Sequence, residues 1–186
     1  MRERAREAAA TAILEAVEHV AAERGIEATS TAAIAERAGI AVGTLYNYFP
    51  DRDALITGLF KLRREEMVPR IVAAADAVRD LPFEQRLRAY LEKVAEAFDQ
   101  FRPFCRVAMS AEGIRVRRTS PAPLTTVTDA LAEIVKPVAK DRANEYAVMI
   151  FGAFKSMMHQ RIERNEPLAP AAKLLADTLL AGMLKR

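Results

Sequence analysis

The side chains best suited to chemistry lie between positions 29 and 52, and the chemistry that they offer is hydrogen bonding. Three consecutive hydroxyl residues, Thr29, Ser30 and Thr31, stand where a short helix is expected to begin. Hydroxyls and the free N–H groups of a helix N-terminus are suitable ligands for a phosphate oxygen. Further along, Thr44 and Asn47 add short polar groups that both donate and accept. This pattern favours binding to a phosphate backbone.

Two short helices joined by a tight turn must position these residues. The sequence predicts helices over residues 31–38 and 41–48, with Gly39 in the turn between them. Glycine readily adopts the left-handed conformation that such a turn requires. Three apolar residues are expected to point inward and fix the angle between the helices: Ile34, Ile40 and Leu45. This is the helix-turn-helix arrangement that places a second helix in the major groove of DNA.

The second short helix is expected to present a small readout surface. Gly43 lets the backbone approach DNA closely, Val42 can touch a thymine methyl group, and Tyr48 can present its phenol to the DNA backbone. Helix-turn-helix hairpins also occur in proteins that bind no DNA, and tyrosines are often core aromatics with a polar tip. Spacing alone therefore leaves both interpretations open.

The residues themselves resemble a known family. The matching segments are residues 28–31, 34–35, 38–40, 43–49 and 51–55, preceded by a helix that ends at Gly25-Ile26. Over about residues 7–67 the chain is similar to the DNA-binding domain of the TetR family of bacterial repressors. The resemblance implies phosphate contacts by Thr29, Ser30, Thr31 and Arg52, major-groove positions for Gly43, Thr44 and Asn47, and bracing of the DNA backbone by Tyr46 and Tyr48.

The chain departs from the family pattern at the readout surface. Ala41 and Val42 stand where many members carry Ser and Lys, and Ala32 and Ala33 replace longer polar residues. The operator sequence is therefore not predicted. A basic arm at the start of the chain, formed by Arg2, Arg4 and Arg6, is a candidate for a supplementary contact in the minor groove, with a disordered terminus as the alternative.

The overall charge gives little support for DNA binding. The 186 residues carry a net charge of +3, and residues 1–60 hold six arginines, no lysine and nine acidic residues. The attraction to phosphate must therefore come from local placement of charge. A helical ligand-binding scaffold that no longer binds DNA remains an alternative.

The rest of the chain is expected to be all-α. Ala, Glu, Arg and Leu dominate, and only seven glycines are present. Further helices are predicted over residues 5–24, 53–80, 82–103, up to 111, 124–140, 142–165 and 168–185, about nine in all, with an Arg-, Ser- and Pro-rich loop from Gly113 to Pro123. The expected domains are an N-terminal three-helix DNA-binding domain at 7–67, with its helix-turn-helix at about 30–49, and a helical effector-binding and dimerisation domain at 68–186.

The last two helices are expected to pair with a second copy of the chain. The helix over 142–165 is apolar on two faces, and both must be covered. The predicted interface residues are Met149, Ala153, Met157, Leu175, Leu179, Gly182 and Met183. Closure of a monomeric core by the same two helices is the alternative.

The resemblance also implies an effector pocket inside the C-terminal bundle. The candidate lining residues are Phe98, Phe101, Phe104, Met109, Met149, Phe154, Met158 and His159, with Glu112, Arg115, Arg117 and Arg118 near a possible entrance. Aromatic and thioether groups suit an apolar or aromatic ligand. For each single residue, ordinary core packing is the alternative.

An enzyme is the main rival from another class. The sequence has no zinc-ligand spacing, no glycine-rich phosphate loop and no nucleophile elbow, and a dyad of Cys105 with His159 would rest on two isolated residues. We therefore expect no catalytic residue, no metal and no cofactor. One cysteine, no signal peptide and no long apolar run favour a cytoplasmic protein that does not enter a membrane.

The combined expectation is a ligand-responsive transcriptional regulator. It would bind a palindromic operator in double-stranded DNA as a homodimer, most simply as a repressor, and a small, largely apolar effector would release it. Ligand binding would shift the helix that starts at Asp53, with Pro69 as a pivot. Activation instead of repression stays open.

Overall fold

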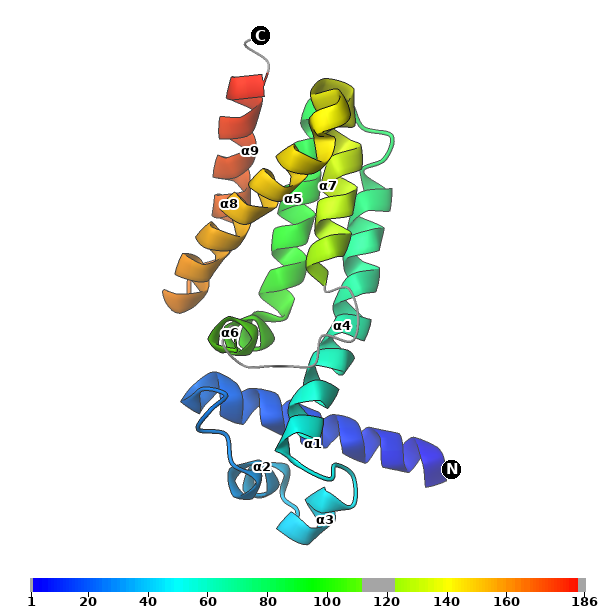
Figure 1. Cartoon of the computed structure of the whole chain (residues 1–186), viewed down its shortest axis with the longest axis vertical. Coiled ribbons are helices and arrows are strands. Elements are labelled where there is room, and N and C mark those ends of the chain that lie inside the picture. Colours follow the sequence, from blue (N-terminus) through cyan, green and yellow to red (C-terminus); the bar gives the residue numbers. More distant parts are fainter. Residues whose placement is uncertain (1, 112–122, 184–186) are drawn as a thin grey trace. The chain divides into compact units, whose positions relative to one another are not determined.

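The computed structural model describes residues 2–111 and 123–183, and within these ranges the chain is helical without a strand (Figure 1). The elements are α1 (Arg2–Arg24), α2 (Thr31–Ala38), α3 (Val42–Tyr46), α4 (Arg52–Ala77), α5 (Phe83–Gln100), α6 (Arg102–Ser110), α7 (Pro123–Ala139), a 3-10 turn (Lys140–Arg142), α8 (Ala143–Glu163) and α9 (Ala169–Met183). The all-α prediction is confirmed. Most of the predicted loop from Gly113, together with Glu112, Arg115, Arg117 and Arg118, lies outside the described residues.

The described helices pack as two units. Residues 2–65 and 103–111 form the first unit, and residues 66–102 and 123–183 form the second. Helix α4 thus belongs to the first unit up to Glu65 and to the second from Glu66, and Pro69 lies inside it without dividing it into two helices. Helix α6 groups with the N-terminal helices, an association that its position in the sequence does not suggest.

The first unit is held together by α1, which packs on α2 and contacts α4. Its apolar face buries Ile13, Val17 and Val20. Arg63 of α4 donates from both Nε and Nη2 to Glu18 Oε2 at 2.5 Å, and Glu18 is buried. Because a buried carboxylate is costly without a cationic partner, this ion pair fixes α4 against α1.

A glycine allows close packing between α4 and α1. A Cβ atom at Gly58 would come within 3.1 Å of both Leu14 Cδ2 and Phe49 Cε1. Phe60, on the same helix, makes an edge-to-face contact with Phe104 of α6, with ring centroids 5.1 Å apart. This aromatic contact is one reason that α6 groups with the first unit.

The second unit is a bundle built by α5, α7, α8 and α9. Contacts join α5 to α9, α5 to α7, α7 to α8 and α8 to α9, and Figure 1 shows α5 and α7 side by side. Its core includes Tyr90, Leu131 and Phe154, all fully buried. Helix α7 begins at Pro123, the helical position at which proline is most acceptable because its missing N–H has no partner there.

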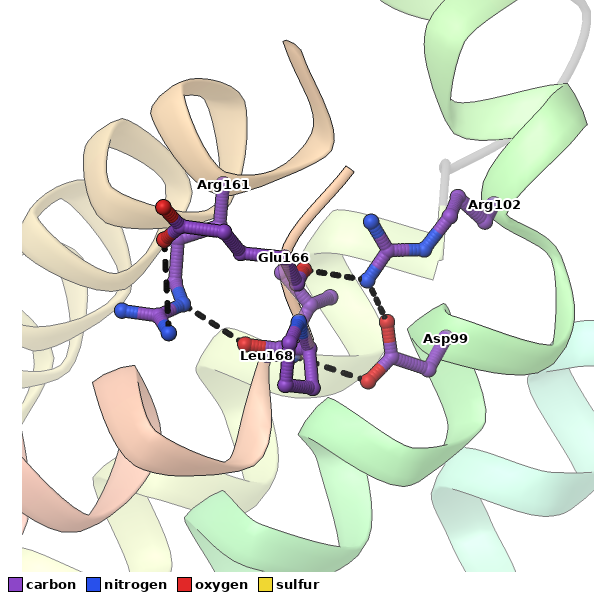
Figure 2. A network of polar contacts seen from close by, with 6 residues as sticks. Asp99, Arg102, Arg161, Glu166 and Leu168 are labelled. Atoms are coloured by element: carbon purple, nitrogen blue, oxygen red, sulfur yellow. Dashed lines mark hydrogen bonds and ion pairs between the residues drawn. The ribbon is translucent and has the colours of Figure 1, made fainter. Parts of the chain in front are cut away.

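A polar network ties the α8–α9 loop to the end of α5 (Figure 2). The Asp99 carboxylate accepts from Arg102 through Oδ1 and from the Leu168 N–H through Oδ2, the latter at 2.9 Å just before α9. Arg102 also donates to the Glu166 carbonyl at 2.5 Å, and Arg161 donates to the Pro167 carbonyl at 2.6 Å. One carboxylate thereby joins α5 to the N-terminus of α9, where its charge is favourable.

No helix in the described parts of the chain combines the length and the apolar character needed to cross a membrane.

Candidate nucleic-acid interface

The turn between α2 and α3 is built by local hydrogen bonds. Ser30 is the N-cap of α2, and its Oγ accepts from the Ala33 N–H at 3.2 Å. Gly39 adopts the left-handed conformation at φ 67°, and the N–H groups of Gly39 and Ile40 donate to the carbonyls of Glu36 and Ala35. This is the Schellman arrangement, in which a glycine ends a helix while the last carbonyls stay bonded. The predicted role of Gly39 is confirmed.

The predicted inward residues set the angle between the two helices. Ile34 and Leu45 are fully buried, and Ile40 is half-buried. Helix α3 ends at Tyr46, two residues earlier than predicted, because the N–H groups of Asn47 and Tyr48 bond three residues back in a tighter turn. Five helical residues are enough to present one exposed face.

That exposed face carries most of the predicted readout residues. Val42, Gly43, Thr44 and Asn47 are exposed. A Cβ atom built at Gly43 would meet nothing within 4 Å, so the surface around this glycine is open. The exposed surface of α3 is small and carries short side chains. The backbone of α3 can therefore come close to a bound partner.

Two predicted phosphate ligands form hydrogen bonds inside the fold. Thr29 is 2% exposed, and its hydroxyl donates to the Gly25 carbonyl at 2.9 Å. Arg52 donates from Nε to the Thr29 carbonyl at 3.0 Å and from Nη2 to the Ile26 carbonyl. Because the Thr29 hydroxyl is buried and bonded within the fold, its predicted phosphate contact does not fit this arrangement, whereas the predicted phosphate contact of half-buried Arg52 stays a prediction. Both residues hold the segment before α2 against the start of α4.

The remaining tyrosines and hydroxyls lie at the surface. Tyr46 is 47% exposed, and its phenol oxygen lies 3.5 Å from Thr31 Oγ1. This contact joins α3 to the first turn of α2. Ser30, the N-cap of the same helix, is exposed, so hydroxyls, a phenol and a helix N-terminus face solvent in this region. Such a group suits one phosphate oxygen.

Tyr48 is partly covered by the start of α1. The Arg6 guanidinium carbon lies 6.0 Å from the centroid of the Tyr48 ring, the geometry of a cation–π contact. Residues 2–6 are helical, so the alternative of a disordered terminus is wrong, while the minor-groove contact of Arg2, Arg4 and Arg6 stays a prediction. Sequence periodicity does not detect this first turn because it carries no apolar residue besides Ala5.

Four of the predicted effector residues are buried in the second unit. Phe98, Phe154 and Met158 are buried in the second unit, with the rings of Phe98 and Phe154 6.3 Å apart. Phe101 is buried, and the guanidinium carbon of Arg70 lies 5.0 Å from the centroid of its ring.

The other four predicted effector residues are not among the buried core residues of the second unit. Phe104 and Met109 belong to the first unit. Met149 is 67% exposed, and His159 is half-exposed with its Nε2 3.1 Å from Glu163 Oε1. Neither Met149 nor His159 points into the core of the bundle, so their assignment to an interior pocket is wrong.

Tyr90 is a polar core residue that the sequence alone does not single out. Its ring is fully buried, and its hydroxyl lies 3.5 Å from the Val127 carbonyl, a long hydrogen bond. Burial and, secondarily, the negative charge of Asp129 raise the pKa of the Tyr90 hydroxyl well above its usual value. It therefore stays a neutral donor. Its position on the inner face of the predicted helix is the signal that could have identified it.

Helices α8 and α9 each carry large apolar side chains that stay exposed in the single chain. Val148 and Met149 on α8 and Leu174 on α9 are each at least 60% exposed, and Ala153 and Gly182 are exposed on the same two helices. Met157 and Leu179 are half-buried, and the Met183 side chain lies outside the described residues. Leu175 is 8% exposed and packs inward, so its assignment to an interface is wrong, and the neighbouring Leu174 is the exposed leucine.

Comparison with known proteins identifies the N-terminal domain. Residues 13–59 match the model of the bacterial regulatory proteins of the tetR family. The HTH-type transcriptional regulator PksA of Bacillus subtilis is 42% identical over 83 residues, which span 44% of this chain and 40% of PksA. The match thus covers less than half of that relative's length.

Solved structures extend the likeness to the whole fold. The fatty acid degradation regulator FadR from Bacillus halodurans has a TM-score of 0.76 at 19% identity, covering 96% of this chain and 97% of that one. The regulator FadR from Bacillus subtilis, solved in complex with stearoyl-CoA, has a TM-score of 0.69 at 18% identity, covering 92% and 98% of the two chains. Residues 13–59 are therefore similar to the N-terminal domain of the tetR family of bacterial regulatory proteins, and the described chain shares the fold of these solved regulators.

Proposed function

We propose that this protein is a DNA-binding transcriptional regulator, acting in the cytoplasm as a repressor that α3 directs to its operator. The observation that carries the proposal is the open face of α3, with exposed Thr44 and Asn47 beside Gly43, whose Cβ position is empty. The tetR-family match over residues 13–59 covers this helix. Short polar groups read base edges, and the glycine admits a close approach of the DNA backbone.

The contacts expected with DNA come from the exposed residues alone. Ser30, Thr31, Tyr46 and Tyr48 would hold phosphates, since each has a hydroxyl at or near the surface. Val42 and Thr44 would meet bases in the major groove, with Asn47 at the end of the helix. Thr29 and Arg52 would act by keeping α2 in position.

The proposed active form is a homodimer paired through the exposed face of α8 and α9. Val148 and Met149 on α8 and Leu174 on α9 are apolar side chains that a monomer leaves in water, and large exposed apolar areas mark association sites. Ala153 and Gly182 are small and exposed, so two helices can approach closely. A two-fold dimer would read a palindrome whose half-sites lie about 34 Å apart along the DNA.

The proposed effector is a largely apolar molecule bound within the second unit. Phe98, Phe154 and Met158 supply buried apolar surface there, and the Tyr90 hydroxyl supplies a neutral donor with only a long internal bond. The FadR of Bacillus subtilis was solved with stearoyl-CoA, and a long-chain acyl thioester is accordingly the first compound to test. A carbonyl oxygen on the effector would accept from Tyr90.

The dimer would exist in an equilibrium between two arrangements, and effector binding would shift this equilibrium toward the one that binds DNA more weakly. Helix α4 is shared by both units, and Pro69 has no N–H for the carbonyl of Glu65, the last residue of the first unit before α4 enters the second. An effector that favours one arrangement would change the separation of the two α3 helices. A coupling of about 1–3 kcal/mol would lower the DNA affinity about 5–150-fold.

One experiment tests the proposal against the alternative of a scaffold that does not bind DNA. The purified protein is titrated onto duplex DNA flanking its own gene at a series of salt concentrations, with a scrambled duplex as control. The proposal predicts site-specific binding that weakens steeply with salt. Equal, weak binding to both duplexes at every salt concentration would favour the scaffold.

A further inference from the structure

The first two turns of α1 carry a guanidinium pair that the proposed DNA contacts leave unused. Arg2 and Arg6 are four residues apart in a helix, so they lie on one face. Two residues advance about 200° around a helix, so Arg4 lies on the opposite side. Glu3 and Glu7 occupy the flank between these two faces.

The Arg2–Arg6 face is anchored to a residue that closely follows α3. The Arg6 guanidinium sits over the Tyr48 ring at 6.0 Å, and Tyr48 comes directly after exposed Asn47. This contact orients Arg6 next to the readout surface. Among the described residues, neither Arg2 nor Arg6 forms an ion pair with a carboxylate, and both are exposed.

The chemistry of this pair suits a phosphate diester. A guanidinium held near an aromatic ring by a cation–π contact still has N–H groups to donate, and two of them match two phosphate oxygens. Arg6 lies beyond the first turn of α1, so the contact would come from its side chain and not from the free amides of the helix end. Arg2 lies about 6 Å further along the axis, within reach of a neighbouring phosphate of the same strand.

We propose that Arg6, oriented by Tyr48, and Arg2 bind backbone phosphates of double-stranded DNA next to the base pairs that α3 reads. The inference rests on the proposed function and adds a second line of contacts to it, made by α1 in its helical state. In a unit whose first 60 residues are net negative, two guanidinium groups on one helix face would supply local positive charge for phosphate. Arg4, on the other side of the helix, takes no part.

Matched arginine variants test the assignment. Arg6→Ala and the double variant Arg2→Ala/Arg6→Ala are compared with Arg4→Ala, which removes the same charge from the same segment. Binding of the full chain to the duplex flanking its own gene is measured across a salt series, and circular dichroism checks α1. The slope of log affinity against log salt should become shallower by about 0.9 for each phosphate that a variant can no longer neutralise, whereas Arg4→Ala should keep the wild-type slope.

Neutral phosphates locate the contact on the DNA. Methylphosphonate groups, which lack the charge, replace single phosphates near each half-site. At one position the substitution should weaken binding of the wild type and leave binding of Arg6→Ala unchanged. A Tyr48→Leu variant should reduce the effect of substituting Arg6, which a double-mutant cycle between the two residues measures as non-additivity.

The outcomes separate this inference from the proposed function. If wild-type protein binds the duplex but Arg4→Ala reduces affinity and slope as much as Arg6→Ala does, only the general charge of the segment matters and the inference fails. If no methylphosphonate position distinguishes wild type from Arg6→Ala, it fails as well. Absence of specific binding by the wild type at low salt would overturn the proposed function itself.

Discussion

Arg52 donates from Nε to the carbonyl oxygen of Thr29 at 3.0 Å, which joins the first turn of α4 to the residue before the N-cap of α2. A second donor, Nη2, reaches the Ile26 carbonyl. The segment before the helix-turn-helix is thereby held by Arg52 of α4, a residue whose sequence position suggests a DNA contact. We expect the orientation of α2, and through it that of α3, to depend on these two hydrogen bonds of Arg52.

Removing these two hydrogen bonds should reduce stability. Arg52→Ala leaves two carbonyls without their charged donor, and we expect a decrease of about 1.5–3 kcal/mol in the free energy of unfolding, measured by urea denaturation. The control is Arg37→Ala, whose partner Glu23 lies 3.7 Å away at the surface and whose removal should cost under about 1 kcal/mol. Unchanged stability together with a lower salt slope in DNA binding would show that Arg52 holds phosphate after all.

Gly43 should separate folding from DNA binding. Alanine fits the free protein, because its Cβ meets nothing within 4 Å, and it should raise helix stability by up to about 1 kcal/mol. The same methyl group would stand between α3 and DNA. We expect Gly43→Ala to melt at or above the wild-type temperature and to bind its operator at least about tenfold more weakly. If Gly43→Ala binds the operator with wild-type affinity, DNA does not approach α3 closely at this position.

A charge at exposed Leu174 of α9 should change the oligomeric state. Leu174→Glu puts a charge on a side chain that is 60% exposed, so the single chain should fold normally while the dimer dissociates. Analytical ultracentrifugation should show monomers, and affinity for a palindromic operator should drop about 100-fold because the second half-site is no longer linked. Val138→Glu, at an exposed valine of α7, is the matched control. A dimeric Leu174→Glu would contradict the proposed interface.

Tyr90 should make stability depend on alkaline pH. Its pKa is raised above the ordinary value of 10.0, mainly by burial and further by Asp129. Because only the unfolded chain ionises readily above pH 10, stability should fall there by about 1.4 kcal/mol per pH unit, and below pH 10 the neutral hydroxyl's contribution is complete. Urea unfolding of wild type and Tyr90→Phe at pH 8, 10 and 11 isolates this effect. Identical pH profiles would contradict burial of the hydroxyl.

Much of this architecture can be predicted from the sequence because helices have strong local signals. The hydroxyl cluster at Ser30, the glycine at position 39 and the cap at Asp51, whose Oδ1 accepts from the Ala54 N–H at 2.7 Å, all define helix ends through bonds a few residues long. The helix-turn-helix and the all-α fold follow from such signals and from the family resemblance.

The local sequence does not determine which group a long polar side chain bonds to, or whether an apolar side chain is buried. Nothing local tells whether Arg52 meets a phosphate or a carbonyl 23 residues away along the chain. Leu174 and Leu175 differ by about 100° around α9, and this angle places Leu174 in solvent and Leu175 in the bundle's own core. Met149 is predicted both in the pocket and at the interface for the same reason. Periodicity gives the spacing of apolar residues, whereas packing sets which of them turn inward.

The most direct test of DNA recognition by α3 is the affinity of the purified protein for the duplex flanking its own gene. The affinity is measured across a salt series, with a scrambled duplex as control. Recognition predicts specific binding that falls steeply as salt rises, with several phosphate contacts in the slope. Weak, equal binding to both duplexes, even at low salt, would contradict it and leave a helical ligand-binding protein without a DNA partner.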